Sequence, residues 1–276
     1  MNLAFELNGV SKRFRRAGGG WTEALQGVDL EIRPGEAVAI IGPSGAGKTT
    51  LMRLLNLSLR PDEGALRVDG TDPTSLSQSG LRKLRARTAT VYQQHHLIPA
   101  LRVVHNILAG RLSVWSLAGA VLSLFSPRET ALAAWAAGEV GILEKLWERT
   151  DRLSGGQQQR VAIARALVQN PRHLLADEPV ASVDPSLADA IVGLLRRVCA
   201  GDGKTLVVNL HDVPLALRHF GRIVGVRDGR VRFDLPVEEV DSGLLVSLYE
   251  GDEELTSDVR QWFQEIFQTG QPGLPR

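Results

Sequence analysis

Residues 42–49 read GPSGAGKT and match the pattern G-x-x-x-x-G-K-[ST] at every fixed position. An apolar run of strand length, AVAIIG, ends at Gly42, and a stretch with helical spacing, TTLMRLLNLSL, follows the loop. The glycines allow backbone N–H groups to surround a phosphate, Lys48 reaches the β and γ phosphates, and the Thr49 hydroxyl is a ligand for Mg²⁺. The stretch therefore predicts a nucleoside triphosphate site at the end of a buried parallel strand.

Strand and helix patterns alternate along the rest of the chain. Strands are predicted where short apolar runs stop at turn residues, and helices where apolar residues recur every three to four positions. This alternation indicates an α/β fold with a mainly parallel sheet. The predicted strands cover residues 3–14, 24–32, 36–41, 64–70, 89–97, 172–179 and 204–210, and a hairpin covers 222–235 with its turn at Asp228–Gly229. Helices are predicted over 49–59, over 102–150 throughout and over 186–200.

Composition excludes several classes of protein. With 32 Lys and Arg against 31 Asp and Glu, the net charge of +1 offers no basic field for nucleic acid. The small basic cluster KRFRR, residues 12–16, is interpreted as a solvated turn. The single cysteine, Cys199, excludes an internal disulfide and a cysteine-based metal site, which fits a reducing, cytoplasmic setting. The N-terminus has no basic start followed by an apolar run, so no signal peptide is expected.

Two adjacent carboxylates follow the apolar run HLLA at residues 173–176. Asp177, at the end of the predicted strand, is suited to hold Mg²⁺ through water. Glu178 comes next and is placed to orient or deprotonate an attacking water as general base. By itself an Asp-Glu-Pro sequence after a strand is more often a helix cap or turn. The phosphate loop elsewhere in the chain reverses that preference.

A Ser-Gly-Gly turn precedes a helix in RLSGGQQQRVAIARAL, residues 152–167. A helix that begins in this way offers unpaired N–H groups and a positive dipole end to an anion. LSGGQ, residues 153–157, resembles the signature motif of ATP-binding cassette (ABC) proteins and lies between the phosphate loop and the Asp-Glu strand, as in that family. The resemblance implies that Ser154 and Gly156 contact the γ-phosphate of ATP held by a second subunit. It also implies the ABC ATPase fold, a P-loop NTPase core with an N-terminal antiparallel β subdomain and an inserted helical subdomain.

Other features of the cassette family have counterparts here. Gln93 in VYQQHHLIP matches the glutamine that senses the γ-phosphate and metal, although Gln94 lies beside it. Asp184 in SVDP matches a residue at the dimer interface, and His211 in VVNLHDV matches the histidine that contacts the γ-phosphate. The family usually has Thr and Leu at positions 180 and 183, where this chain has valines, and neither change removes a catalytic group.

The resemblance assigns roles residue by residue. Phe14 in GVSKRF matches the aromatic residue that stacks on adenine, and Trp21, after a glycine-rich turn, is its rival. Catalysis is assigned to Lys48, Gln93, Glu178 and His211, Mg²⁺ to Thr49, Gln93 and Asp177, and ATP to Phe14, Gly42, Pro43, Ser44, Gly45, Ala46, Gly47, Lys48, Thr49, Thr50, Ser154, Gly155, Gly156, Gln157 and Asp184.

All cassette motifs occur once, in the family's order, across residues 3–235. One chain therefore has one phosphate loop and one signature turn, and the resemblance implies a head-to-tail dimer of two chains around two ATP molecules. We expect an ABC ATPase domain over residues 1–250, with its helical subdomain at about 102–165. Residues 251–276 are expected to form an amphipathic helix and a loose tail, with the helix packed on its own domain or, alternatively, holding the dimer together.

Residues 112–125, LSVWSLAGAVLSLF, are the most apolar stretch and are too short to span a bilayer. They belong to the helical insertion of residues 102–150, the region through which ABC importer ATPases meet their membrane subunits. The first interpretation of this stretch is the insertion's own core. The alternative is an exposed apolar patch that docks a membrane subunit.

Three stretches resemble the ATP-binding subunit of phosphonate importers: GRLSVWSLAGAVLSLFS, LADEPVASVDP and LHDVPLALRHFGRIVGVRDGRVRFDL. The resemblance implies a peripheral protein at the cytoplasmic face of the inner membrane, bound to integral permease subunits and served by a separate substrate-binding protein. Phosphite, phosphate or another oxyanion remains an alternative cargo, and an exporter-type ATPase an alternative partner. A soluble ABC ATPase acting on DNA or ribosomes conflicts with the short spacing of the motifs and the single cassette. A non-hydrolysing regulatory module conflicts with the presence of Glu178 and His211.

Overall fold

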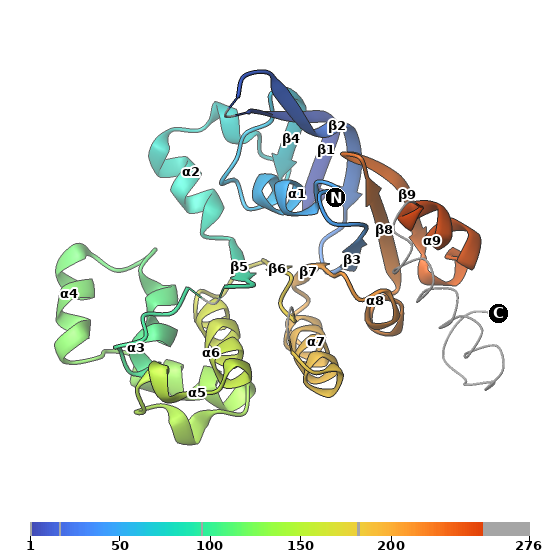
Figure 1. Ribbon diagram of the computed structural model, residues 1–276. Helices are drawn as coiled ribbons and strands as arrows, with labels where there is room; N and C mark the ends of the chain where they lie inside the picture. The colour runs from blue at the N-terminus through green and yellow to red at the C-terminus, as the bar shows by residue number, and fades with distance from the viewer. Residues whose placement is uncertain (1, 17, 95, 181–182, 251–276) are drawn as a thin grey trace. The chain divides into compact units, whose positions relative to one another are not determined.

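The computed structural model of the 276-residue chain describes residues 2–16, 18–94, 96–180 and 183–250 (Figure 1). The chain divides into two compact units. One unit consists of residues 1–75 and 205–276, and the other of residues 76–204. The phosphate loop lies in the first unit, and the Asp-Glu pair and the Ser-Gly-Gly turn lie in the second.

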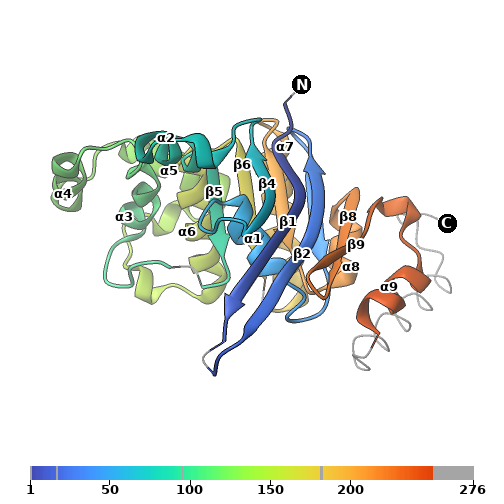
Figure 2. The ribbon, with the colours of Figure 1, turned by 90° about the horizontal axis from the view of Figure 1, so that it is seen from above.

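The first unit begins with an antiparallel sheet of strand order β2-β1-β4, whose three strands lie side by side in Figure 2. Alternate residues of β1 are buried and face alternate residues of β2, so one face of the sheet is apolar. The basic residues 12–15 lie within β1 and not in a turn, because the strand continues to the glycine-rich turn at 18–20. The solvated-turn interpretation is therefore wrong for them. The strands are β1 (Phe5–Arg15), β2 (Trp21–Ile32) and β4 (Glu63–Val68).

The same unit contains the parallel strand β3, between β7 and β8. Its four residues from Val38 onward are buried, as the continuous apolar run predicts for a strand covered on both faces. The helices α8 and α9, which follow β7 and β9, were not among the predicted elements. The elements are β3 (Ala37–Ile41), α1 (Lys48–Leu55), β7 (Thr205–Asn209), α8 (Val213–His219), β8 (Arg222–Arg227), β9 (Arg230–Pro236) and α9 (Ser242–Tyr249), with 3₁₀ turns at Pro73–Ser75 and Val237–Glu239.

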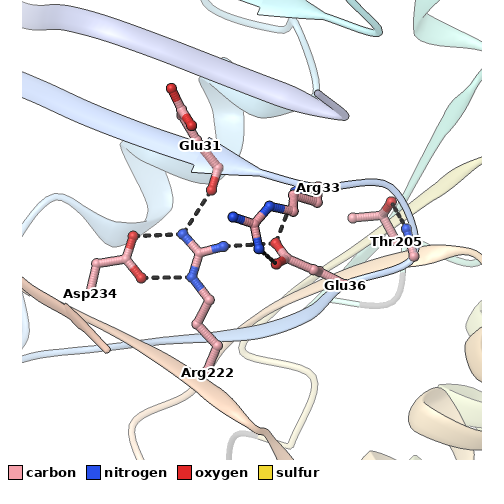
Figure 3. A network of polar contacts seen from close by, with 7 residues as sticks. Glu31, Arg33, Glu36, Thr205, Arg222 and Asp234 are labelled. Atoms are coloured by element: carbon pink, nitrogen blue, oxygen red, sulfur yellow. Dashed lines mark hydrogen bonds and ion pairs between the residues drawn. The ribbon is translucent and has the colours of Figure 1, made fainter. Parts of the chain in front are cut away.

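Arg222, at the start of β8, ties together the strands of this unit (Figure 3). Its Nε and Nη2 each donate to the carboxylate of Asp234 on β9 at 2.7 Å, and Nη1 donates to Glu36 at 2.7 Å. Nη2 also donates to the backbone oxygen of Glu31 on β2 at 2.7 Å. The two carboxylates raise the pKa of Arg222, with Asp234 the larger cause. A single guanidinium thus fixes β2, β8, β9 and the turn that leads into β3.

The second unit pairs two parallel strands and carries most of the helices. The helices α3 and α5 pack against α6, and α7 contacts α6 as well. The helix α2 is capped by the hydroxyl of Ser77 and was not among the predicted elements. The elements are α2 (Gln78–Arg85), β5 (Thr88–Tyr92), α3 (Val103–Leu108), α4 (Leu117–Phe125), α5 (Thr130–Glu139), α6 (Gly155–Val168), β6 (His173–Asp177) and α7 (Pro185–Ala200), with 3₁₀ turns at Ala109–Arg111, Leu143–Lys145 and Thr150–Arg152.

The helix α4 lies at the outer end of this group of helices, away from α6 (Figures 1 and 2). Its large apolar side chains are exposed, with Leu117 at 82% and Phe125 at 85%, and only Ser123 is buried. The interpretation of this stretch as the insertion's core is therefore wrong, because small side chains and not large ones face the unit. The segment that carries α4, residues 112–128, is called the excursion here. Where the excursion meets the rest of the unit, Glu129 accepts hydrogen bonds from Arg111 and from the Trp115 indole.

The predicted α/β architecture is confirmed: mainly parallel strands, an N-terminal antiparallel sheet and a helical insertion. None of the described helices is long and apolar enough to cross a membrane. The amphipathic helix predicted within residues 251–276 lies outside the described residues.

Candidate nucleotide site

The phosphate loop follows β3 directly, and two of its glycines are required by close backbone contacts. A Cβ on Gly42 would lie 1.9 Å from the Val226 carbonyl oxygen, and one on Gly47 would lie 2.4 Å from the Ala24 carbonyl oxygen. Both glycines also have positive φ, 148° and 104°. The loop is therefore pressed against β8 and β2 and can be built only with glycine at these positions.

Lys48, the first residue of α1, is buried at 4% exposure. Its Nζ donates to the carbonyl oxygens of Gly42 and Pro43 at 2.6 and 2.9 Å, so the ammonium lies within the loop that surrounds it. A charged group held there by carbonyl oxygens is placed to meet an anion that enters the loop. The next residue, Thr49, is exposed.

The turn of the β8–β9 hairpin braces the phosphate loop. The backbone N–H of Gly229 donates to the Ala46 carbonyl at 3.0 Å, and the Gly229 carbonyl accepts from the Gln26 N–H at 2.8 Å. A Cβ on Gly229 would lie 2.9 Å from the Ala24 oxygen, so glycine is needed here too. Sequence reasoning found this hairpin turn but missed its contact with the loop, because nothing in the Asp-Gly signal says what the turn packs against.

His211 lies at the same sheet edge as the phosphate loop. In the parallel pair of β3 and β7, Ile40 is opposite Asn209, and the Leu210 N–H donates to the Ile40 carbonyl at 3.0 Å. His211 and Gly42 therefore each follow the paired positions by two residues. The first unit thus brings together the predicted phosphate loop and the predicted γ-phosphate histidine.

In the second unit, the strands β5 and β6 end together. Tyr92 is opposite Asp177, so Gln93 and Glu178 leave the same sheet edge side by side. Gln93 is exposed, and Glu178 is partly exposed with a φ of 51°. A positive φ at a residue other than glycine stores strain, and such strain is concentrated at functional sites. The predicted sensor, metal ligand and general base are therefore neighbours in this unit.

The signature turn caps α6. Ser154 is the N-cap, its Oγ accepts from the Gln157 N–H at 3.4 Å, and the Gln157 side chain accepts from the Ser154 N–H at 3.0 Å. A Cβ on Gly156 would lie 2.7 Å from the Leu187 side chain on α7, which explains that glycine by packing. A Cβ on Gly155 would have no atom within 4 Å. Packing within the described residues therefore does not require the glycine at 155.

Comparison with known proteins identifies the family. The family model of the ABC transporter matches residues 25–181. The chain belongs to the ABC transporter family. It is 46% identical to the phosphonates import ATP-binding protein PhnC of Thiobacillus denitrificans, over 92% of this chain and 96% of that protein. It is 50% identical to the phosphonates import ATP-binding protein PhnC 1 of Pseudomonas syringae pv. syringae, over 84% and 88%.

Solved ABC cassettes share the fold. The dimeric, post-hydrolysis cassette MJ0796 bound to ADP and Pi superposes with a TM-score of 0.73 at 32% identity, over 84% of this chain and 98% of that one. The cassette cbiO1 of Clostridium perfringens, part of an ABC transporter complex, has a TM-score of 0.74 at 26% identity, over 90% and 95%. The predicted ABC ATPase fold is therefore confirmed.

Asp184 caps the cassette helix α7. Its carboxylate accepts from the Ser186 hydroxyl at 2.6 Å and from the Leu187 N–H at 3.0 Å. Both hydrogen bonds lower the pKa of Asp184, and the bond from the Ser186 hydroxyl is the larger cause. Since Leu187 also packs at Gly156, this loop and the signature turn of the ABC cassette are adjacent in the second unit.

Phe14 lies on the face of the β1–β2 hairpin that meets the phosphate loop. Leu25 is opposite Lys12 in the pairing, and a Cβ on Gly47 would be 2.9 Å from the Leu25 side chain. Phe14 is two residues beyond Lys12 and so on the same face, with the Lys12 ammonium 5.7 Å from its ring centre. It is 38% exposed. The Phe14 ring therefore lies on the face of the β2-β1-β4 sheet that is directed toward the phosphate loop.

Trp21 lies on the opposite face of this hairpin. It is paired with Arg15, and the guanidinium of Arg13 stacks 5.1 Å from its ring centre. It is 59% exposed. The geometry therefore favours Phe14 over Trp21 as the side chain available to a base bound at the phosphate loop.

The proposed metal ligands fit Mg²⁺ by their chemistry. Thr49, Gln93 and Asp177 offer a hydroxyl, an amide oxygen and a carboxylate, all hard oxygen donors. Among the described residues there is no group of three or more His, Cys, Asp and Glu that could hold a metal by itself. A set with a single carboxylate suits Mg²⁺ that is bound together with nucleotide phosphates, as in other nucleotide-dependent enzymes.

Proposed function

We propose that this chain is the ATP-hydrolysing subunit of a membrane complex that imports phosphonates. The observation that carries the proposal is identity along nearly the whole chain to phosphonates import ATP-binding proteins, 46% over 92% of its length. The match extends well beyond the shared ABC region of residues 25–181. The identity is therefore not confined to the region that the ABC transporter family model covers.

The phosphate loop and Lys48 bind the β and γ phosphates of ATP, and Phe14 stacks on adenine. The buried ammonium at the loop supplies positive charge where negative charge develops on the transferred phosphoryl group. Glu178 accepts the proton of the attacking water as general base. His211, at the sheet edge beside the loop, holds that water and the γ-phosphate in position.

Thr49, Gln93 and Asp177 would hold Mg²⁺, which would neutralise charge on the phosphates. Gln93 also reports the state of the γ-phosphate, and its position at the sheet edge beside the base supports this role. The remaining loop residues, Pro43, Ser44, Gly45, Ala46 and Thr50, shape the phosphate cradle.

Two copies of the chain form a head-to-tail dimer in which the signature turn of each copy meets the ATP of the other. Gly155 supports this proposal, because packing in the described residues leaves the space above its Cα open. A phosphate that approaches the helix N-terminus closely requires such a residue. The cassette MJ0796, which shares the fold, is dimeric. Asp184 and Gln157 lie beside this surface.

The helical insertion docks the integral permease, and the chain works as a peripheral protein at the cytoplasmic face of the inner membrane. The exposed face of α4 supports docking there, since Leu117, Leu124 and Phe125 are 82%, 52% and 85% exposed. No charged residue occurs in LSVWSLAGAVLSLFS, residues 112–126. Apolar patches of this kind mark interaction surfaces. A separate binding protein delivers the cargo to the permease, and nucleic acid is not a partner.

The decisive experiment measures ATP hydrolysis by the full complex in lipid nanodiscs, with the binding protein present. The complex is assembled from this chain and the permease subunits that neighbouring genes encode. Addition of methylphosphonate is expected to stimulate hydrolysis, because cargo delivery drives the catalytic cycle. A complex with Glu178→Gln is the matched control and is expected to show no stimulation.

The outcomes separate the alternatives. Stimulation by phosphite or phosphate and not by methylphosphonate would keep the ATPase and replace the cargo. An exporter-type ATPase would be favoured by two results together. Basal hydrolysis would respond to none of these oxyanions, and no gene for a binding protein would lie next to the gene for this chain. Hydrolysis that survives Glu178→Gln would overturn the assignment of the base.

A further inference from the structure

A buried polar cluster is centred on Asn106 of α3, whose side chain is 2% exposed. Its Oδ1 accepts from the Ile98 N–H at 2.8 Å, and its Nδ2 donates to the Ile98 carbonyl at 3.0 Å. The amide thus binds the backbone of Ile98 as a neighbouring strand would. Nδ2 donates a further bond, at 2.9 Å, to the hydroxyl of Thr150.

Thr150 extends the cluster to a second segment of the chain. It is 1% exposed, and its hydroxyl donates to the Leu101 carbonyl at 2.9 Å. The Thr150 N–H also donates to Leu101 at 3.0 Å, and the Asp151 N–H donates to the Pro99 carbonyl at 3.0 Å. Residues 98–101 and 150–151 are therefore held together by side-chain and backbone bonds at once.

The two segments lead to two different parts of the proposed site. Ile98 lies five residues after Gln93, and Thr150 lies four residues before Ser154. The stretch between Thr150 and Ser154 is short and braced, because the Gln158 side chain donates to the carbonyls of Thr150 and Leu153 at 3.4 and 3.1 Å. The cluster therefore connects the sensor loop, which runs from Gln93 to Pro99, with the signature turn at Ser154.

A second contact holds the sensor loop to the signature helix. Arg165 of α6 donates from Nη1 to the His96 carbonyl at 2.8 Å. His96 has a φ of 48° and meets the Tyr92 ring edge to face at 5.1 Å between ring centres. The exit of the sensor loop is thereby held to α6 as well as to Asn106.

Buried polar groups of this kind resist separation. Each bond that opens leaves a donor or acceptor without water to replace its partner, so the members of the cluster move together or not at all. A displacement of residues 96–99 must therefore carry residues 150–153 with it. Sequence reasoning missed both Asn106 and Thr150, since neither belongs to a recognised motif.

We propose that Asn106 and Thr150 are positioning residues that transmit the state of the Gln93 loop to the signature turn. The proposal rests on the functions proposed above for Gln93 and Ser154. ATP sensed by Gln93 in one copy then sets the orientation of the turn that the same copy offers to its partner. The cluster couples the two ATP sites of the dimer through the second unit of each chain.

The test compares isosteric variants of the full chain. Asn106→Leu and Thr150→Val remove the link, and Thr150→Ser retains the hydroxyl as a conservative rescue. Gln169→Met is the matched control, because the Gln169 amide also bridges backbone carbonyls in this unit, those of Ala86 and Thr88 at 3.0 Å, but at the opposite end of β5. The readouts are hydrogen exchange, nucleotide affinity and the hydrolysis rate.

Hydrogen exchange tests the link without any need for activity. Thr150→Val is expected to speed exchange at the amides of residues 97 and 98, and Asn106→Leu to speed it at residues 150–154, by about tenfold or more as the local bonds open. The control and Thr150→Ser are expected to leave both segments as they are. Unchanged exchange in both Thr150→Val and Asn106→Leu, with the fold retained, would overturn the proposal.

Kinetics then separates positioning from general damage. The affinity of the chain for ATP is expected to stay within about twofold, while kcat falls about tenfold in either variant and no further in the double variant, as for residues that act as a unit. Additive losses in the double variant, or equal losses in the Gln169 control, would overturn the proposal. A failure of the proposed ATPase function would appear separately, as hydrolysis by the unaltered chain that does not depend on Lys48.

Discussion

Several of the residues to which the chemistry is assigned have unusual backbone geometry. Gly42 and Gly47 have positive φ because the phosphate loop is pressed against neighbouring strands. Glu178 has a φ of 51°, which costs on the order of 1 kcal/mol or more for a residue other than glycine. A residue that served only as a turn after β6 would be replaced by glycine or asparagine at no loss. The strain is consistent with a carboxylate that the reaction needs.

Glu178→Gln is expected to reduce kcat by about 10²-fold to 10⁴-fold, the contribution of a general base, and to leave ATP binding intact. The variant should accumulate as an ATP-bound dimer on size-exclusion chromatography, because the step that separates the copies no longer occurs. Glu238→Gln, on a 3₁₀ turn after β9, is the control. A Glu178→Gln protein that hydrolyses ATP near the normal rate would contradict the assignment.

Phe14→Ala is expected to weaken ATP binding by about 5-fold to 150-fold, since stacking of a base on an aromatic side chain contributes about 1–3 kcal/mol. Trp21→Ala should change the affinity little, because Trp21 stacks on Arg13 on the other face of the hairpin. Calorimetric titration of both variants with a non-hydrolysable ATP analogue measures the difference. The reverse order of effects would exchange the two assignments.

The sequence allowed the motif residues to be predicted one by one, because each motif joins a fixed spacing to a known chemistry. Gly229 and Asn106 could not be predicted in this way. Gly229 braces the phosphate loop from a hairpin far along the chain, as its bond to Ala46 shows. Such residues act through contacts between distant segments, and no local pattern records those contacts.

Among the elements, strands with continuous apolar runs and helices with clear apolar spacing were the most predictable. The strand β3 follows from its apolar run, and α6 from the Ser-Gly-Gly turn that ends at Gly156, whereas the helices α2, α8 and α9 were missed although each has a side-chain N-cap. The orientation of α4 was not predictable. Its apolar residues recur with helical spacing, and that spacing alone does not say which side faces the protein. The structure turns Ser123 inward and Leu117 and Phe125 outward.

The double variant Leu117→Gln, Phe125→Gln is expected to change the free energy of unfolding by no more than about 0.5 kcal/mol, because both side chains are exposed. It should nevertheless lose stimulation of hydrolysis by the reconstituted permease while basal hydrolysis persists. Leu143→Gln, at an apolar position that is 51% exposed outside the excursion, is the control. Full stimulation of the double variant would remove α4 from the docking surface.

Arg222→Met tests the guanidinium that joins four elements of the first unit. The substitution removes bonds to Asp234, Glu36 and the Glu31 carbonyl and leaves two carboxylates together. We expect a loss of about 2–3 kcal/mol in the free energy of unfolding, the scale for hydrogen bonds to charged groups. Arg149→Met, which breaks the exposed pair with Asp151, should change the free energy of unfolding much less, because water screens exposed ion pairs. Urea unfolding of both variants makes the comparison, and equal losses would show the clamp to be an ordinary surface pair.

At the scale of the whole molecule, each chain has one phosphate loop and one signature turn, and the two lie in different units. A single chain therefore offers one half of each of two sites in the proposed head-to-tail dimer. This arrangement has a consequence that a self-contained site does not share. Chains with different defects can complement one another, because one site of the mixed dimer draws both of its halves from unaltered segments.

Complementation of Lys48→Ala by Gly155→Asp is the test. Each variant alone should be inactive: the first lacks the phosphate lysine, and the second places a negative charge where the partner's ATP approaches. Gly155→Asp is expected to fold, since a Cβ there meets nothing within 4 Å and an acidic residue in the first turn of a helix is favourable. Refolded or co-expressed mixtures should recover at most about a quarter of normal hydrolysis, because half of the dimers are mixed and each has one intact site of two.

The doubly substituted chain, mixed with the unaltered chain, separates shared sites from self-contained ones. In a head-to-tail dimer each site of the mixed pair would contain one altered half, so mixed dimers should be inactive. If each chain instead used its own signature turn, the unaltered copy would remain fully active within the mixed dimer, and the two single variants would not rescue one another. Hydrolysis rates of the two mixtures therefore move in opposite directions under the two arrangements, and only the shared arrangement makes both copies necessary for every turnover.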